Sequence, residues 1–134
     1  MDHSHAVAWV DHSEARILTF GTGGTVRRLV QSTIHPDHKD HKTTGFGSGH
    51  AHDQSYLTAV AEALQSVREI LIVGPGGARK TLAHFIHDQV PSLAPYIMGV
   101  EPLDRRSEPE ILDFARKYFE RSDLMRASWN LSVT

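Results

Sequence analysis

The sequence has no cysteine, no large excess of charge of either sign and no apolar run long enough to cross a membrane. The absence of cysteine excludes disulfides, thiolate metal ligands and cysteine nucleophiles, and it makes a cytoplasmic location the expectation. A formal net charge of −2 argues against strong non-specific binding to nucleic acid, so any such contact must be local. The start of the chain lacks a basic leader segment, and we therefore expect a soluble, unprocessed protein.

What is present is ordinary globular composition. Hydrophobic residues make up 40% and charged residues 22% of the chain, which argues against overall disorder. With 134 residues the chain suits one core and is short for two. We expect a single domain over residues 1–134.

The first third of the sequence predicts three strands. Residues 6–10 and 17–20 are short apolar runs separated by the polar residues 11–14, which is typical of a hairpin. Residues 26–34 favour β-structure and add a third strand. Residues 6–34 are therefore predicted to form an antiparallel meander.

The middle of the sequence alternates helices and strands. Apolar residues over 53–68 repeat at the spacing of one buried helix face, and Asp53 is the expected N-cap. Residues 69–73 form a continuous β-rich run, which is typical of a strand covered on both faces. A second amphipathic helix is predicted to stop before Pro91, and residues 96–100 to form another strand.

A third helix is predicted near the end of the chain. Ser107 and Glu110 have the spacing of a capping box, and the helix that follows is expected to end at about Arg121, leaving residues 121–134 as a tail. The element order is then β-β-β-loop-α-β-α-β-α. Such an order predicts an α/β fold with a mixed five-stranded sheet, a meander followed by βαβα.

Residues 35–52 lack apolar periodicity and contain mainly His, Asp, Lys, Gly, Ser and Thr. Loops of this length without regular structure are uncommon in compact domains and often carry function. We therefore expect a long exposed loop that contains the functional residues.

The whole order of elements resembles the middle domain of the class I release factors of eukaryotes and archaea, and of their Pelota relatives. The resemblance rests on the meander 6–34, the segment 35–52 before the first helix, and the stretches "EILIVGPGGARKTLAHF" and "PYIMGVEPLD". It implies a ribonuclease H-like fold with about three helices. Bacterial proteins that consist of this domain alone, known as translational machinery or release-factor-like proteins, are similar in arrangement.

One departure from the release factors concerns their Gly-Gly-Gln tripeptide, which serves peptide release. The corresponding stretch here is "KTTGFGSGHAHDQSY", where Ala51, His52 and Asp53 precede Gln54. Peptide release is therefore not implied. The resemblance to Pelota-like proteins, which lack the tripeptide, implies a non-catalytic module of ribosome rescue or hibernation, with the ribosome or ribosomal RNA as partner and no cofactor.

The histidines of residues 35–52 have two interpretations. Imidazoles at these spacings are able to bind Zn²⁺, with His50 and His52 as the candidate ligands of a metal-binding protein or metal-dependent enzyme. Protonated near their ordinary pKa of about 6.5, they instead make the segment cationic toward RNA phosphates. The expected contact residues are His35, His38, Lys39, His41, Lys42, His50 and His52, with Gly45, Gly47 and Gly49 supplying flexibility.

Two other functions, nucleotide binding and nuclease activity, have less support in the sequence. The stretch "LIVGPGGARKT" resembles a phosphate-binding loop, but Arg79 stands where that loop needs glycine, so a plain strand-to-helix turn is favoured. A two-metal nuclease needs several carboxylates. Asp11 is better explained as a turn residue, and Glu62 lies off the apolar face of its helix. His84 and His87 are expected to be packing or surface residues.

Overall fold

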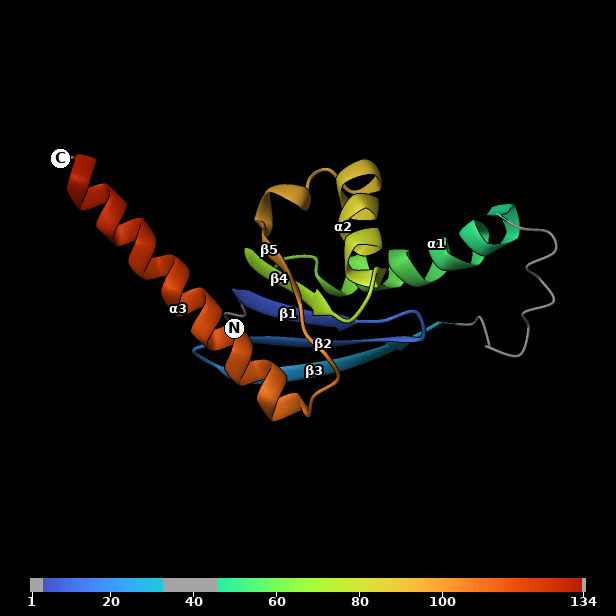
Figure 1. The fold of residues 1–134 in the computed structure, drawn as a ribbon, viewed down its shortest axis with the longest axis horizontal. Helices are drawn as coiled ribbons and strands as arrows, with labels where there is room; N and C mark the ends of the chain where they lie inside the picture. Colours follow the sequence, from blue (N-terminus) through green and yellow to red (C-terminus); the bar gives the residue numbers. More distant parts are fainter. Residues whose placement is uncertain (1–3, 33–45, 134) are drawn as a thin grey trace.

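A mixed sheet forms the centre of the protein. The computed structural model describes the backbone of residues 4–32 and 46–133, and the side chains of 4–32 and 54–125 (Figure 1). In these parts five strands have the spatial order β3-β2-β1-β4-β5. Their bounds are β1 His5–Val10, β2 Glu14–Gly21, β3 Gly24–Gln31, β4 Glu69–Gly74 and β5 Ile97–Pro102.

The first three strands pair antiparallel, whereas β1 with β4 and β4 with β5 are parallel. This arrangement confirms the predicted meander and the predicted mixed sheet of an α/β fold. The parallel pairs follow from the intervening helices, because a strand that returns through a helix re-enters the sheet in the same direction.

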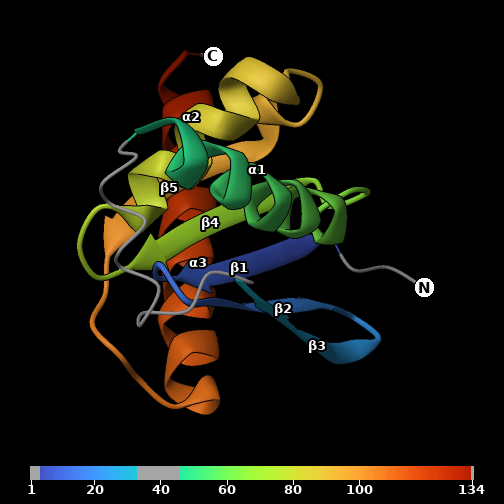
Figure 2. The same cartoon turned by 90° about the vertical axis from the view of Figure 1, so that its right-hand side faces the viewer.

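Within the described ranges, three α-helices cover the two faces of the sheet. Helices α1 (Phe46–Ala63) and α2 (Ala78–Gln89) lie on one face, and α3 (Glu108–Val133) crosses the other (Figure 2). A short 3₁₀ turn, η2 (Ala94–Tyr96), precedes β5.

The core is divided by the sheet into two clusters. Along β1, Ala6, Ala8 and Val10 pack toward α1 and α2, while Val7 and Trp9 pack toward α3. Successive side chains of a strand point to opposite faces, so a strand covered on both sides is apolar throughout. This explains the unbroken apolar runs of β1 and β4.

Two local signals in the sequence are confirmed. Asp11 Oδ1 accepts the backbone N–H groups of Ser13 (2.8 Å) and Glu14 (2.9 Å), so Asp11 shapes the β1–β2 turn. At the start of α3, Ser107 N–H donates to Glu110 Oε1 (3.0 Å), and Glu110 N–H donates to Ser107 Oγ (3.3 Å). That reciprocal pair is the predicted capping box.

Two predicted helix boundaries are wrong. Helix α1 begins at Phe46 rather than at Asp53, and α3 continues to Val133 rather than ending at about Arg121. Both extra stretches project beyond the sheet (Figure 1). Apolar residues recur at the helical period only where one face of a helix packs against a core. Where a helix extends beyond the core, its sequence loses that period although its backbone hydrogen bonds continue.

The first correction changes the predicted exposed loop. Residues 46–52, expected in that loop, belong to α1, so the backbone of Gly47, Gly49, His50 and His52 is helical. Among the helices of the described ranges, none has both the length and the apolar character needed to cross a membrane.

Candidate functional site at the carboxyl edge of the parallel strands

One edge of the sheet gathers the ends of several elements. The parallel neighbours β1 and β4 end there at Val10 and Gly74. The chain leaves β1 toward β2 on one side and leaves β4 toward β5 on the other. In open α/β sheets, ligands bind beside such a change of direction, at the carboxyl ends of the strands.

The two elements that flank the segment 35–52 meet this same edge. β3 ends at Gln31 and α1 begins at Phe46, and both ends lie on the side of the sheet that carries the β1–β2 turn (Figure 1). Six of the predicted contact residues lie outside the described residues: His35, His38, Lys39, His41, Lys42 and Gly45. The side chains of His50 and His52 also lie outside the described part.

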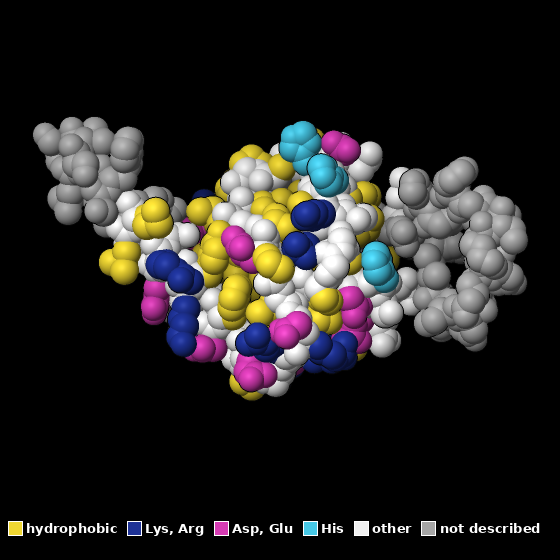
Figure 3. Space-filling model, in the orientation of Figure 1, with side chains coloured by type: hydrophobic (Ala, Val, Ile, Leu, Met, Phe, Trp, Pro, Cys, Tyr) yellow, Lys and Arg dark blue, Asp and Glu magenta, His cyan; other side chains and the backbone are white. Residues whose placement is uncertain are grey.

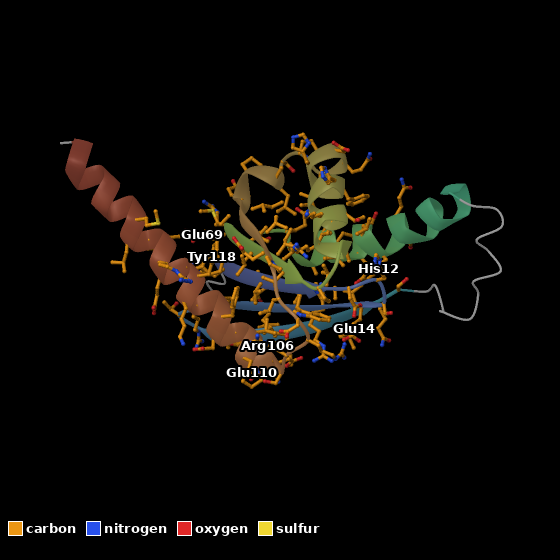
Figure 4. The ribbon with its side chains drawn as sticks, viewed as in Figure 1. His12, Glu14, Glu69, Arg106, Glu110 and Tyr118 are labelled. Atoms are coloured by element: carbon orange, nitrogen blue, oxygen red, sulfur yellow. The ribbon has the colours of Figure 1, made fainter. Side chains whose placement is uncertain are left out.

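The β1–β2 turn is tied to α1 by a buried tyrosine. Tyr56 O–H donates to the carbonyl oxygen of Asp11 at 3.0 Å, and the Tyr56 side chain is part of the core between α1 and the sheet. His12, the next residue of the turn, is exposed at this edge (Figure 4). The β1–β2 turn is therefore held against α1, the helix that follows the histidine-rich segment 35–52.

The carboxylates at this edge are balanced by arginines. Glu14 Oε2 accepts from Arg16 Nε at 2.9 Å and from Arg105 Nη2 at 3.2 Å. Arg105 also lies 3.9 Å from Asp11 Oδ2 and 5.5 Å above the ring of Trp9. Among the described residues, no group of three His, Asp or Glu side chains is placed to hold a metal ion.

A small cavity opens between α1, α2 and the end of β1. Its volume is about 50 Å³, which is room for a few water molecules and far below the several hundred Å³ of a drug-sized or nucleotide site. Its apolar lining consists of Val10, Leu57, Val60, Ala78 and Leu82, and its polar lining of Asp11, His12, Tyr56 and Thr81.

The glycine-rich turn after β4 is a connection into α2, as the sequence predicted. Gly76 has a φ of +62°, in the left-handed region that favours glycine. Arg79 donates to the carbonyl oxygens of Gly74 (3.2 Å) and Gly76, and Thr81 O–H donates to Gly77 O at 3.2 Å. The Arg79 guanidinium is thus held by carbonyl oxygens of the turn.

The remaining histidines lie elsewhere. His84 and His87 are exposed on α2, and His87 Nδ1 lies 3.2 Å from Asp88 Oδ1. They are surface histidines, one of the two predicted alternatives. The visible face in Figure 3 shows acidic and basic side chains interspersed, which is typical of a solvated surface.

Sequence reasoning missed His5, Tyr56 and Arg105. His5 Nε2 lies 3.2 Å from Glu69 Oε1, and its ring stacks on Phe20 at 5.5 Å. Because His5 and Glu69 are register partners in the parallel pair β1–β4, knowing that β1 and β4 are neighbours would have revealed the contact. Tyr56 had a weak signal, since it directly precedes the buried face of α1.

Comparisons with solved structures identify the fold. No protein-family model and no curated protein sequence matches the chain significantly. The chain is similar to Pelota of Archaeoglobus fulgidus, with a TM-score of 0.62, 12% identity and coverage of 96% of this chain and 37% of that one. It is also similar to Pelota of Thermoplasma acidophilum, with a TM-score of 0.56, 21% identity and coverage of 82% and 31%.

A third similar structure is Dom34 of S. cerevisiae, described as a translation termination-like factor involved in RNA quality control pathways and interacting with Hbs1. Here the TM-score is 0.56, the identity 11% and the coverage 97% of this chain and 37% of that one. The chain thus spans about a third of the length of these proteins. It shares the fold of one part of Pelota-type proteins, as the order of its elements predicted.

Proposed function

We propose that the protein is a non-catalytic, ribosome- or RNA-associated binding module of translation, of the rescue or hibernation type. In this proposal it resembles the single-domain bacterial proteins of the translational machinery and works in the cytoplasm. The partner is the ribosome or ribosomal RNA.

The observation that carries the proposal is the extent of the fold similarity. Nearly the whole chain, 96%, superposes on about a third of a Pelota protein, and Dom34, which matches over 97% of the chain, is described as a translation termination-like factor. A shared fold alone does not define activity, so the contact surface has to be argued from this chain.

The contact surface we propose is the segment 35–52, whose flanking elements β3 and α1 are described on either side of it. Its lysines Lys39 and Lys42 are offset by Asp37 and Asp40, so its positive charge comes from the protonated form of its histidines. Local positive charge of this kind binds RNA phosphates in a salt-dependent way. At the carboxyl edge of β1, the acidic side chains of Asp11 and Glu14 are paired with arginines and so repel phosphate less.

A role in peptide release has little support from this chain. Gln54, the only glutamine in the stretch that corresponds to the Gly-Gly-Gln tripeptide, is an exposed residue within α1 and follows Ala51, His52 and Asp53. A helical backbone with side chains at these positions lacks the conformational freedom that paired glycines give.

Sedimentation through sucrose gradients tests the proposal. Wild-type protein from growing and from starved cells is expected in ribosomal fractions, and a variant with His35, His38 and His41 replaced by glutamine and Lys39 and Lys42 by alanine is expected to remain at the top. The matched control replaces the exposed His84 and His87 of α2 by glutamine and should sediment like wild type. Absence of the wild type from every ribosomal fraction in both conditions contradicts the proposal.

The alternative function is metal binding through the same histidines, either as a metal-binding protein or as a metal-dependent enzyme. The spacing of His50 and His52 in a segment rich in imidazoles favours it. Metal analysis of protein purified without a histidine tag separates the two functions. Stoichiometric zinc that is lost in a His50→Ala/His52→Ala variant, without ribosome association of either protein, establishes the alternative.

A further inference from the structure

The outer strand of the meander, β3, is an open edge of the sheet. Within the described residues it pairs with β2 alone, over all eight residues and without a shift in register. It contains no proline, and all its residues except Val30 are exposed. A long, regular edge strand presents unpaired backbone groups that another strand is able to bind.

The backbone groups that face outward are identified by the ladder with β2. Ser32 N–H donates to Ser13 O at 2.8 Å, toward β2. In an antiparallel pair the residues alternate between those that exchange hydrogen bonds with the partner and those that do not. The outward-facing N–H and C=O groups therefore belong to the residues at odd positions of the strand, Thr25, Arg27, Leu29 and Gln31.

The side chains along this edge form a charged centre with an apolar residue on each side. Val26 is 52% exposed and Leu29 55% exposed, unusually open positions for large hydrophobic residues of a sheet. Between them lie Arg27 and Arg28. Arg27 Nε is 2.7 Å from Glu108 Oε1 at the start of α3, while Arg28 projects from the opposite face of the strand, which carries α1 and α2.

We infer that the β3 edge binds an extended peptide strand whose sequence has the pattern apolar–acidic–acidic–apolar. Backbone hydrogen bonds to the outward-facing groups would supply binding, and the side-chain pattern would supply specificity, as in β-strand addition generally. Apolar residues of the peptide lie beside Val26 and Leu29, and its acidic residues lie opposite the two arginines. Opposite charges directly across a strand pair stabilise it.

A second copy of this chain fits the edge less well than an acidic peptide. Antiparallel pairing about a two-fold axis requires outward-facing residues to meet outward-facing residues. An axis through Arg27 or Arg28 places that arginine opposite its own copy, and like charges directly opposite each other destabilise a strand pair. An axis through Val26 or Leu29 avoids this repulsion, but β3 has no acidic residue to place opposite either arginine, so a self-pair lacks the charge complementarity of the peptide.

RNA is also a poorer occupant than a peptide. Phosphates would engage Arg27 and Arg28, but they would leave the outward-facing backbone groups of β3 and the exposed Val26 and Leu29 unused. The inference uses only residues of β3 itself, so it does not rest on the proposed function.

The test uses ¹⁵N-labelled full-length protein and an eight-residue peptide, Thr-Thr-Val-Glu-Glu-Val-Thr-Gly. Its central pattern is the same read in either direction, so it suits a parallel or an antiparallel arrangement. We expect the largest amide chemical-shift changes at Thr25, Arg27, Leu29 and Gln31. A peptide with lysines in place of both glutamates should bind about tenfold more weakly.

Two peptides with N-methyl groups on alternate residues test the backbone contact. One set of methyl groups blocks the amides that face β3, and the other set faces solvent, so one peptide should lose binding and the other should retain it. If both bind alike, the contact is not β-strand addition and the inference fails.

Two variants of the protein test the side-chain contact. Arg28→Glu should weaken binding of the acidic peptide about tenfold, while Arg68→Glu, the same change at an exposed arginine outside β3, should leave it unchanged. Equal weakening by both variants would show a long-range charge effect and overturn the inference.

Three further results would overturn it: no shift at saturating peptide, dimerisation of the free chain through β3 in analytical ultracentrifugation, or tighter binding of single-stranded RNA than of the peptide to the same amides.

Discussion

Gly74, at the end of β4, packs directly against the backbone carbonyl of Val10 at the end of β1, and a Cβ atom built on Gly74 overlaps that oxygen. The φ of Gly74, +151°, is also one that residues with a side chain rarely adopt. The carboxyl ends of the two central strands therefore approach each other closely only because this residue is glycine.

Replacing Gly74 by alanine tests the close approach. We expect Gly74→Ala to lower the free energy of unfolding by about 2 kcal/mol or more, because the methyl group must displace the backbone of β1. Urea denaturation followed by circular dichroism measures the change. The control is Gly77→Ala, where no atom lies within 4 Å of the added Cβ; an equal loss in both variants would show that the Val10 contact is not the cause.

A second prediction concerns the hydrogen bonds between β1 and the connection from β5 to α3. Trp9 Nε1–H lies 3.2 Å from both the Leu103 and the Asp104 carbonyl oxygens. Trp9→Phe retains a buried ring but removes the donor, so we expect a loss of about 1 to 3 kcal/mol in the free energy of unfolding. Thermal denaturation measures it. A stability equal to that of wild type would mean that water donates to the two carbonyl oxygens in place of the indole, without loss of stability.

The sequence contained enough information for the order of the elements and the class of the sheet. The apolar runs of β1 and β4 indicated strands buried on both faces, and Ser107 with Glu110 indicated the start of α3. These signals are local, because they depend on burial or on hydrogen bonds within a few residues of the chain.

The features that were missed depend on distant parts of the chain or on the absence of a core. Helix α1 extends to Phe46 through Gly47 and Gly49, each of which costs about 1 kcal/mol in a helix relative to alanine, and no apolar period marked that stretch. The contacts of Arg105 with Glu14 and Asp11 join segments far apart in the sequence. Such contacts become predictable only once the strand order is known.

A third prediction follows from the capping box. The hydrogen bonds from Ser107, first that of its backbone N–H, stabilise the ionised Glu110 carboxylate and lower its pKa below the ordinary value. A carboxyl group whose pKa is lowered in the folded state contributes stability above its unfolded pKa, and this contribution is lost as the pH falls through the folded pKa.

Glu110→Gln should therefore be less stable than wild type at neutral pH, and the difference should shrink as the solution is made acidic. Melting temperatures between pH 7 and pH 3 measure this dependence. Asp113→Asn, which removes an exposed carboxylate paired with Lys117 one turn further along α3, is the matched control. A difference between Glu110→Gln and wild type that is constant with pH would contradict the assignment.

A fourth prediction concerns the glycine-rich turn. Because Arg79 donates to the Gly74 and Gly76 carbonyl oxygens, we expect ATP and GTP with Mg²⁺ to leave the melting temperature unchanged. A ligand that binds the native state preferentially raises apparent stability, so a thermal-shift titration is a direct test. Arg79→Met should lower the free energy of unfolding by about 1 kcal/mol through the lost hydrogen bonds. A nucleotide-dependent rise in melting temperature for the wild type would revive the phosphate-binding interpretation.

The last prediction distinguishes charge from metal ligation in residues 35–52. If the histidines contact RNA as cations, binding to ribosomes should weaken as the pH rises through about 6.5, the ordinary pKa of histidine, and should fall with increasing salt. Replacing His35, His38, His41, His50 and His52 by lysine should then preserve binding and remove its dependence on pH, because lysine stays charged over that range. A zinc site would behave in the opposite way: lysine cannot replace imidazole as a ligand, and binding would strengthen as the histidines lose their protons.

Pelleting assays at several pH values, with and without a chelator, distinguish the electrostatic contact from the zinc site. Loss of binding in the lysine variant together with sensitivity to the chelator would reject the electrostatic contact and favour the metal.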